Sequence, residues 1–160
     1  MTTTANVAGA KPGTFLLVHG AWHGGWCWRP LQKILEKAGA TVFAPSLTGL
    51  GDRRHLLSEK VNLQTHVDDV VDLLESEELS DVTLVGHSYA GLVITGAAAK
   101  ARERLAQVIY LDAFVPNPGQ SMLDSDVGEV LGALARAGQE RRRRVEGAAD
   151  ARRQVDGAHR

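Results

Sequence analysis

The chain has 160 residues, 44% of them hydrophobic, and its formal net charge is -1. This length, composition and near-neutral charge predict a single soluble globular domain, and they argue against a disordered, fibrous or membrane protein and against nucleic acid as the main partner. One cysteine, Cys27, leaves no internal disulfide and no cysteine-based metal site, and we expect no bound metal. No apolar run reaches the roughly 18 residues that span a bilayer, and no secretion signal opens the chain, so we expect a cytoplasmic protein.

Four apolar runs have the length of strands: residues 15–18, 41–44, 82–85 and 108–111. They are continuous rather than alternating, which is typical of strands covered on both faces. Between these runs, the sequence predicts helices over residues 30–38, over residues 63–74, and from just after Ser88 to about residue 101. We therefore predict an α/β fold, a mostly parallel sheet with helices on both faces.

The stretch "VTLVGHSYAGLVITG" reads as strand, tight turn and helix, with Ser88 at the apex. A nucleophile elbow, G-x-S-x-G, needs this context, because small residues two positions either side allow the strained turn that exposes the hydroxyl. Gly86 fits this pattern, whereas Ala90 adds one methyl group. The alternative is a serine that only caps the following helix.

A second glycine-bearing turn, "HGAWHGGW", follows the first predicted strand. An oxyanion hole takes one backbone N–H from the residue after the nucleophile and one from such an earlier loop. Tyr89 and Ala21 occupy these two positions. The alternative is a glycine-rich loop with a purely structural role.

Five ordered blocks, from "FLLVHGAWHGGWCWRPL" to "VIYLDAFVPNPGQSMLD", resemble the α/β-hydrolase superfamily. The nearest group is that of the small esterases, which includes plant methylesterases, salicylate-binding protein and hydroxynitrile lyases, with bacterial relatives. The resemblance implies Ser88 as nucleophile, the N–H groups of Ala21 and Tyr89 as oxyanion hole, no cofactor, and small carboxylic esters as substrates. Hydroxynitrile lyases of this group carry threonine where this chain has Gly20, so glycine here favours the esterases.

The serine also needs a histidine and an acid, which follow it in the order Ser, Asp or Glu, His in this fold. Only His159 follows Ser88, in an Arg-rich tail, so the triad histidine is not assigned. We expect His19 and His23 to support the oxyanion loop, His87 to point away from Ser88, and His55 and His66 to have structural roles. Asp112, at the end of the fourth predicted strand, is a possible acid, although the resemblance places the acid after a later strand.

Residues 1–125 are expected to form the N-terminal part of an α/β-hydrolase domain, and residues 126–160 the start of a cap helix and a poorly ordered tail. The few residue types used after about Gly138 are typical of a GC-rich gene read out of frame, so we expect truncation or a frame change there. A native basic tail is the alternative.

We therefore expect a serine carboxylic-ester hydrolase that is impaired in this chain, because the triad acid and histidine are not evident. Two alternatives stay open: a non-catalytic hydrolase-like protein that binds a small ligand, and an enzyme related to the hydroxynitrile lyases. The acyl and alcohol groups of the substrate and the oligomeric state are not predicted.

Overall fold

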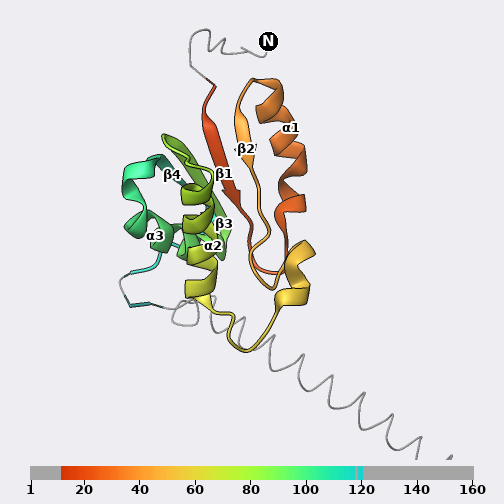
Figure 1. Ribbon diagram of the computed structural model, residues 1–160, viewed down its shortest axis with the longest axis vertical. Helices are drawn as coiled ribbons and strands as arrows, with labels where there is room; N and C mark the ends of the chain where they lie inside the picture. Colours follow the sequence, from red (N-terminus) through yellow and green to blue (C-terminus); the bar gives the residue numbers. More distant parts are fainter. Residues whose placement is uncertain (1–11, 118, 121–160) are drawn as a thin grey trace, which may run out of the picture. The chain divides into compact units, whose positions relative to one another are not determined.

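The computed structural model describes residues 12–117, 119 and 120, which form one four-stranded parallel sheet and the helices around it (Figure 1). The strand order is β2-β1-β3-β4, with bounds β1 Thr14–Val18, β2 Thr41–Phe43, β3 Val82–Ser88 and β4 Leu105–Ala113. All three strand pairs are parallel, as predicted. The boundary that we predicted, between an N-terminal part (residues 1–125) and a tail (residues 126–160), lies outside the described residues.

Three α-helices connect these strands: α1 Arg29–Lys37, α2 Leu63–Ser76 and α3 Ala90–Lys100. Three short 3-10 helices also occur, η1 Gly25–Trp28, η2 Gly51–Leu56 and η3 Arg102–Arg104. Pro30 lies in the first turn of α1, where its missing N–H has no helical partner in any case. Gly39 ends that helix at φ +91°, a conformation that glycine adopts at little cost. No helix in the described ranges is long and apolar enough to cross a membrane.

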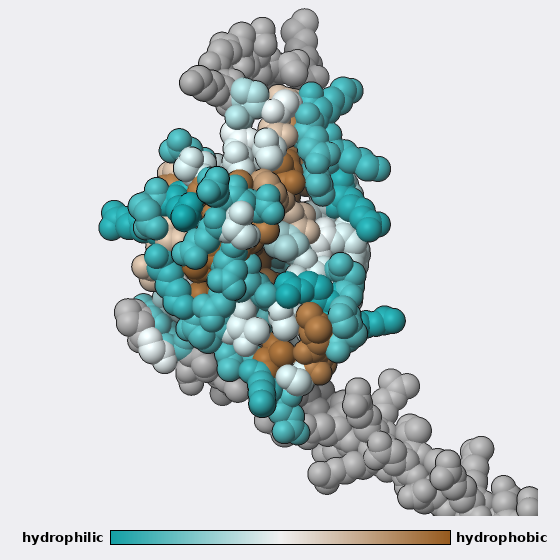
Figure 2. Space-filling model, viewed as in Figure 1, coloured by the Kyte–Doolittle hydropathy of each residue, from teal (hydrophilic) through white to brown (hydrophobic). Residues whose placement is uncertain are grey.

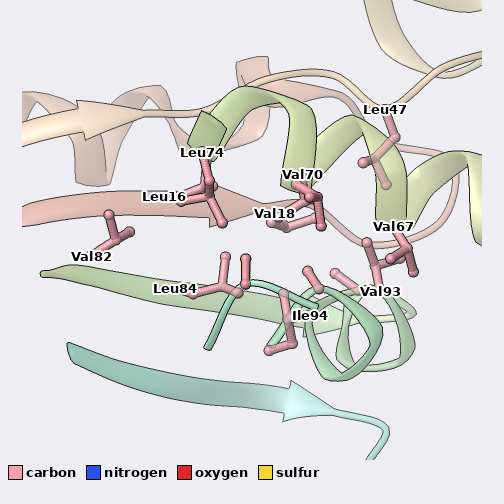
Figure 3. Close-up of a cluster of buried hydrophobic side chains, with 14 residues drawn as sticks. Leu16, Val18, Leu47, Val67, Val70, Leu74, Val82, Leu84, Val93 and Ile94 are labelled. Atoms are coloured by element: carbon pink, nitrogen blue, oxygen red, sulfur yellow. The ribbon is translucent and has the colours of Figure 1, made fainter. Parts of the chain in front are cut away.

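Alternate residues of β1 point to opposite faces of the sheet, and each face has its own core. Leu16 and Val18 pack with apolar side chains of α2 and α3 (Figure 3). Leu17 packs on the other face, in the cluster that includes Leu31 and Leu35 of α1. The predicted covering of both faces is thus confirmed, and it explains the unbroken apolar run in β1.

The predicted elements are all present, with two differences in detail. In α1 only Leu31 and Leu35 pack against the sheet, whereas Ile34 is 65% exposed, because one helix on this face buries a narrow stripe. In α2 the apolar positions Val67, Val70 and Leu74 are buried, and the charged Asp69 is largely buried as well. Its side chain is 11% exposed and pairs with Arg53.

The chain leaving β4 passes against the first turn of α3. A Cβ atom at Gly91 would overlap the backbone carbonyl of Phe114. The N–H of Phe114 also donates to the Ser88 carbonyl at 3.1 Å, so this contact lies directly beside the end of β3.

Gly91→Ala is therefore expected to destabilise the fold by about 2–3 kcal/mol, although alanine is the better helix former by about 1 kcal/mol, because the overlap involves backbone that cannot rotate away. Chemical denaturation measures the change. Gly13→Ala is the control, since its Cβ would lie 3.6 Å from the Phe15 ring, an ordinary contact. Equal stability of the two variants would contradict the close approach at Gly91.

Candidate active site

Ser88 is the last residue of β3 and has a φ of +54°. A non-glycine residue in this region is strained, and such strain is typical of functional sites. The turn is tight because Gly86 has no side chain: a Cβ there would come within 2.7 Å of Ile94 Cδ1. Ala90 fits the motif in spite of its extra methyl group, since it is fully buried. The local conformation is that of a nucleophile elbow.

Helix α3 begins directly after this turn, with Tyr89 at its N-cap position and no side-chain cap. Ser88 therefore does not cap the helix, which was the alternative reading of the sequence. The first N–H groups of a helix have no partner within it and carry partial positive charge. This end of α3 favours negative charge beside Ser88.

The loop after β1 passes directly over Ser88. A Cβ at Gly20 would lie 3.0 Å from both Ser88 Cβ and His87 Nδ1. β1 and β3 are neighbours in the sheet, while the chain visits β2 between them, so the strand order reverses at this point. Ligands of open parallel sheets bind beyond the carboxyl ends of the strands at such a position. Ser88 and Gly20 thus meet where the fold places a binding site.

The peptide group between Gly20 and Ala21 is held in one orientation by histidine. Nδ1–H of His19 donates to the Gly20 carbonyl at 2.8 Å, and the N–H of His23 donates to the same oxygen at 3.4 Å. Because a trans peptide is planar, fixing its C=O points its N–H the opposite way. The Ala21 N–H has no hydrogen-bond acceptor among the described residues, so it is available to a ligand.

His19 is fully buried, and its second ring nitrogen, Nε2, accepts from the N–H of Leu47 at 3.0 Å. Leu47 belongs to the loop that follows β2. One nitrogen donates and the other accepts, so the hydrogen bonds require the neutral imidazole. Burial lowers the pKa of His19 below its ordinary value of 6.5, outweighing the opposite effect of the hydrogen bond to Gly20. The expected structural role of His19 is confirmed.

Tyr89, the residue after Ser88, is held by another histidine. Its hydroxyl donates to Nδ1 of His66 at 2.8 Å, and Nε2–H of His66 donates to the Thr48 carbonyl at 2.9 Å. Burial raises the pKa of Tyr89 to about 12, so the phenol stays protonated as this donation requires. The Tyr89 N–H, like that of Ala21, has no acceptor in the described part of the chain.

The loop after β2 is itself anchored to α2 by Asp69. One carboxylate oxygen accepts from the Thr48 N–H at 2.6 Å, and the other accepts from the Thr48 hydroxyl at 2.8 Å and from Arg53 at 3.1 Å. On the other side, the Ser46 hydroxyl accepts from the Gly25 N–H at 2.9 Å. This loop was not among the predicted site elements, although "PSLTGLGD" directly follows the second strand and contains Gly49 and Gly51, both with positive φ.

The remaining histidines and Asp112 lie apart from the Ser88 hydroxyl, to which no described side chain is hydrogen bonded. His87 packs edge-on against Trp28, with ring centroids 6.4 Å apart, and His23 donates to the Ala21 carbonyl at 2.9 Å. His55 is exposed in η2. Asp112 is the extra residue of a bulge in β4 at φ +45°, beside the strand that carries Ser88, and its role as acid stays a prediction.

A cavity of about 300 Å³ lies beyond the carboxyl end of β2. Its lining includes Trp26, Arg29 and Asp52, none of which belongs to the site described above. Across the described ranges, no group of three or more His, Cys, Asp or Glu is placed to hold a metal ion. The candidate site is therefore built from a serine, two backbone N–H groups and the histidines that hold them.

Acid is expected to destabilise the protein through His19. The unfolded chain takes up a proton near pH 6.5 and the folded chain only at a lower pH, so the free energy of unfolding falls as the pH drops below 6.5, by up to about 1.4 kcal/mol at pH 5.5. Denaturation of wild type and His19→Gln at pH 7.5 and 5.5 measures this loss. An equally steep fall in the variant, which cannot take up this proton, would show that another group is responsible.

Asp69→Asn is expected to lower the free energy of unfolding by about 1–3 kcal/mol, because the amide oxygen can still accept but the NH2 group that replaces the other oxygen cannot, so at least one donor of Thr48 loses its acceptor. Asp68→Asn is the matched control from the same helix. The Asp68 pair with Lys100 is about half exposed, at 46% and 47%, so its loss should cost less than about 0.5 kcal/mol. The same denaturation curves compare both variants, and a cost at Asp68 as large as at Asp69 would contradict the anchoring of the loop.

Comparison with known proteins gives one consistent family. The model of the Alpha/beta hydrolase family matches residues 15–159. A carbendazim hydrolyzing esterase from Nocardioides sp. (strain SG-4G) is 54% identical over 109 residues, which cover 68% of this chain and 45% of the relative. Salicylic acid-binding protein 2 from Nicotiana tabacum is 36% identical over 104 residues, covering 64% of this chain and 40% of the relative. The chain thus spans less than half the length of these curated relatives.

Solved structures agree. An extracellular alpha/beta-hydrolase from a Paenibacillus species superposes with a TM-score of 0.66 and 34% identity, covering 71% of this chain and 46% of that one. Polyneuridine aldehyde esterase gives a TM-score of 0.63 and 28% identity over 70% of this chain and 44% of that one. With the parallel sheet, the turn at Ser88 and a family match over most of its length, this chain belongs to the alpha/beta hydrolase family.

Proposed function

We propose that this chain carries the nucleophile and the oxyanion-binding groups of a serine carboxylic-ester hydrolase, with small-molecule esters as substrates. The observation that carries the proposal is the turn at Ser88, which is held at φ +54° directly opposite Gly20 and Ala21. The names of relatives support it, because the carbendazim hydrolyzing esterase and the plant methylesterases are esterases by name.

In this reaction Ser88 Oγ attacks the carbonyl carbon of the ester and forms a new C–O bond. The π electrons of the carbonyl move onto its oxygen, which becomes an oxyanion. The N–H groups of Ala21 and Tyr89 donate to that oxygen, and each such donor typically contributes about 3–4 kcal/mol to stabilising the transition state. The alcohol then leaves with a proton, and water releases the acid from the serine.

The attack also needs a base that takes the serine proton. His19 and His66 cannot serve in their present hydrogen bonds, because both nitrogens of each ring are occupied. His159 lies outside the described residues and is the histidine that follows Ser88 in the chain order of this fold. Asp112 is the candidate acid within the described part of the chain.

Two alternatives predict different behaviour. A non-catalytic protein would bind a small ester without turnover, and it is favoured by the lack of any described imidazole hydrogen bonded to Ser88. A relationship in function to the hydroxynitrile lyases has less support. Gly20 has no hydroxyl to place beside Ser88, at the point where a side chain would come within 3.0 Å of Ser88 Cβ.

A fluorophosphonate probe tests the proposal, because it phosphonylates an activated serine and loses fluoride. A protein in which the reading frame after about Gly138 is restored is expected to be labelled once, at Ser88 by peptide mass spectrometry, and its Ser88→Ala variant is expected to lose all labelling. The control Ser76→Ala changes an exposed serine of α2 and should label as wild type does.

Labelling that persists in Ser88→Ala would sink the assignment of the nucleophile. A wild-type protein that is never labelled, yet binds small esters saturably, would instead favour the non-catalytic alternative. Cyanohydrin cleavage without ester hydrolysis would support the lyase.

A further inference from the structure

Trp22 lies in a backbone conformation that a tryptophan rarely adopts. The Gly20 carbonyl accepts from the N–H of His23 at 3.4 Å, so residues 20–23 form a β-turn with Trp22 at its third position. The φ of Trp22 is +61°, a value that favours glycine at this position of a turn. A large side chain here is a true outlier, and the strain must be compensated elsewhere.

The Trp22 side chain makes few contacts that would stabilise the folded state. Its residue is 78% exposed, and its ring has no aromatic partner among the described residues. The two other tryptophans differ: Trp28 is 7% exposed, and Trp26 is 52% exposed but lies 5.7 Å from the ring of His23. Trp22 therefore combines backbone strain, which disfavours the folded state, with an exposed aromatic ring, whose burial contributes little to offset that strain.

The strained residue Trp22 lies directly beside the candidate site. Trp22 follows Ala21, whose N–H faces the site, and it comes two residues after Gly20, which contacts Ser88. Successive Cα atoms are 3.8 Å apart, so the Trp22 Cα is within about 7.6 Å of the Gly20 Cα. An indole at this distance can reach a group attached to a carbonyl bound at Ser88.

Other exposed apolar side chains occur in the segment that follows β2. Leu56 and Leu57, which follow the loop after β2, are 43% and 66% exposed. Figure 2 shows a largely hydrophilic face with hydrophobic residues near its lower end, where the strands of Figure 1 point. Apolar surface near a site with two polar donors is the usual composition of a small-molecule pocket.

We infer that Trp22 is a specificity-determining residue that presents a flat apolar surface to an aromatic group of the ester substrate. The inference rests on the proposed ester chemistry at Ser88. Stacking of an aromatic group on the indole would compensate the strain at Trp22 only in the bound state, so the residue would cost stability and favour binding.

Three variants separate strain from contact. Trp22→Gly removes both the strain and the indole, and its midpoint of thermal unfolding is expected to rise by about 2–5 °C. Trp22→Ala removes the indole but keeps a Cβ at φ +61°, so it should show a smaller rise or none. Trp26→Ala is the matched control, an exposed tryptophan of the same loop region without positive φ, and it should not raise the midpoint.

Binding is measured by calorimetry with phenylboronic and methylboronic acid. In each adduct Ser88 Oγ bonds to boron and the hydroxyl proton passes to solvent, so both probes report on the nucleophile and only one carries a ring. Wild type is expected to prefer the phenyl compound. Trp22→Gly and Trp22→Ala should each lose about three- to tenfold of that preference, whereas Trp26→Ala should keep it.

The outcomes distinguish this inference from the proposed function. A fall in the unfolding midpoint of Trp22→Gly would show that the indole packs within the protein, and it would overturn the inference. Binding of methylboronic acid at Ser88 with an unchanged phenyl preference in both Trp22 variants would overturn the inference and leave the proposed function standing. Binding of neither acid to wild type would overturn the proposed function, and the inference with it.

Discussion

The geometry of the candidate site depends on one loop, the segment that follows β2. Leu47 donates its N–H to His19, and Thr48 accepts through its carbonyl from His66. Each of these histidines in turn holds one side of the site, His19 through the Gly20 carbonyl and His66 through the Tyr89 hydroxyl. The Gly20–Ala21 peptide group and the Tyr89 side chain are therefore both held by the same short segment, although they belong to different strand ends.

The hydrogen bonds of His19 use a neutral imidazole, and burial favours that form. A histidine with one donating and one accepting nitrogen can bridge two polar groups, as His19 bridges the Gly20 carbonyl and the Leu47 N–H. The fully buried ring of His19 has a lowered pKa, and the phenol of Tyr89 a raised one, because burial disfavours the charged form of either group. Hydrogen bonds to neutral side chains thus hold the groups beside Ser88 before a ligand arrives, which suits the stabilisation of a charge that develops only during reaction.

Two positions of backbone strain lie at this site. Ser88 and Trp22 both have positive φ, one at the apex of the elbow and one in the facing loop. The strain at Ser88 exposes its hydroxyl, and the strain at Trp22 exposes its indole. Neither conformation improves the packing of the core, which lies on the two faces of the sheet and not at the ends of its strands. Such a separation of core and site is common, because binding and catalytic residues often lie on loops that a rigid scaffold positions.

The sequence by itself determined the order of strands and helices and the positions of Ser88, Ala21 and Tyr89, because apolar periodicity and glycine-bearing turns are local signals. The burial of Asp69, the exposure of Ile34, and the hydrogen bonds of His19 and His66 were decided only by the tertiary structure. These burials and hydrogen bonds depend on which distant segment contacts each residue, and the spacing of residues along the chain cannot predict that. The partners of His19 and His66 are 28 and 18 residues away, and only the parallel sheet, by bringing the ends of β1, β2 and β3 together, makes them neighbours.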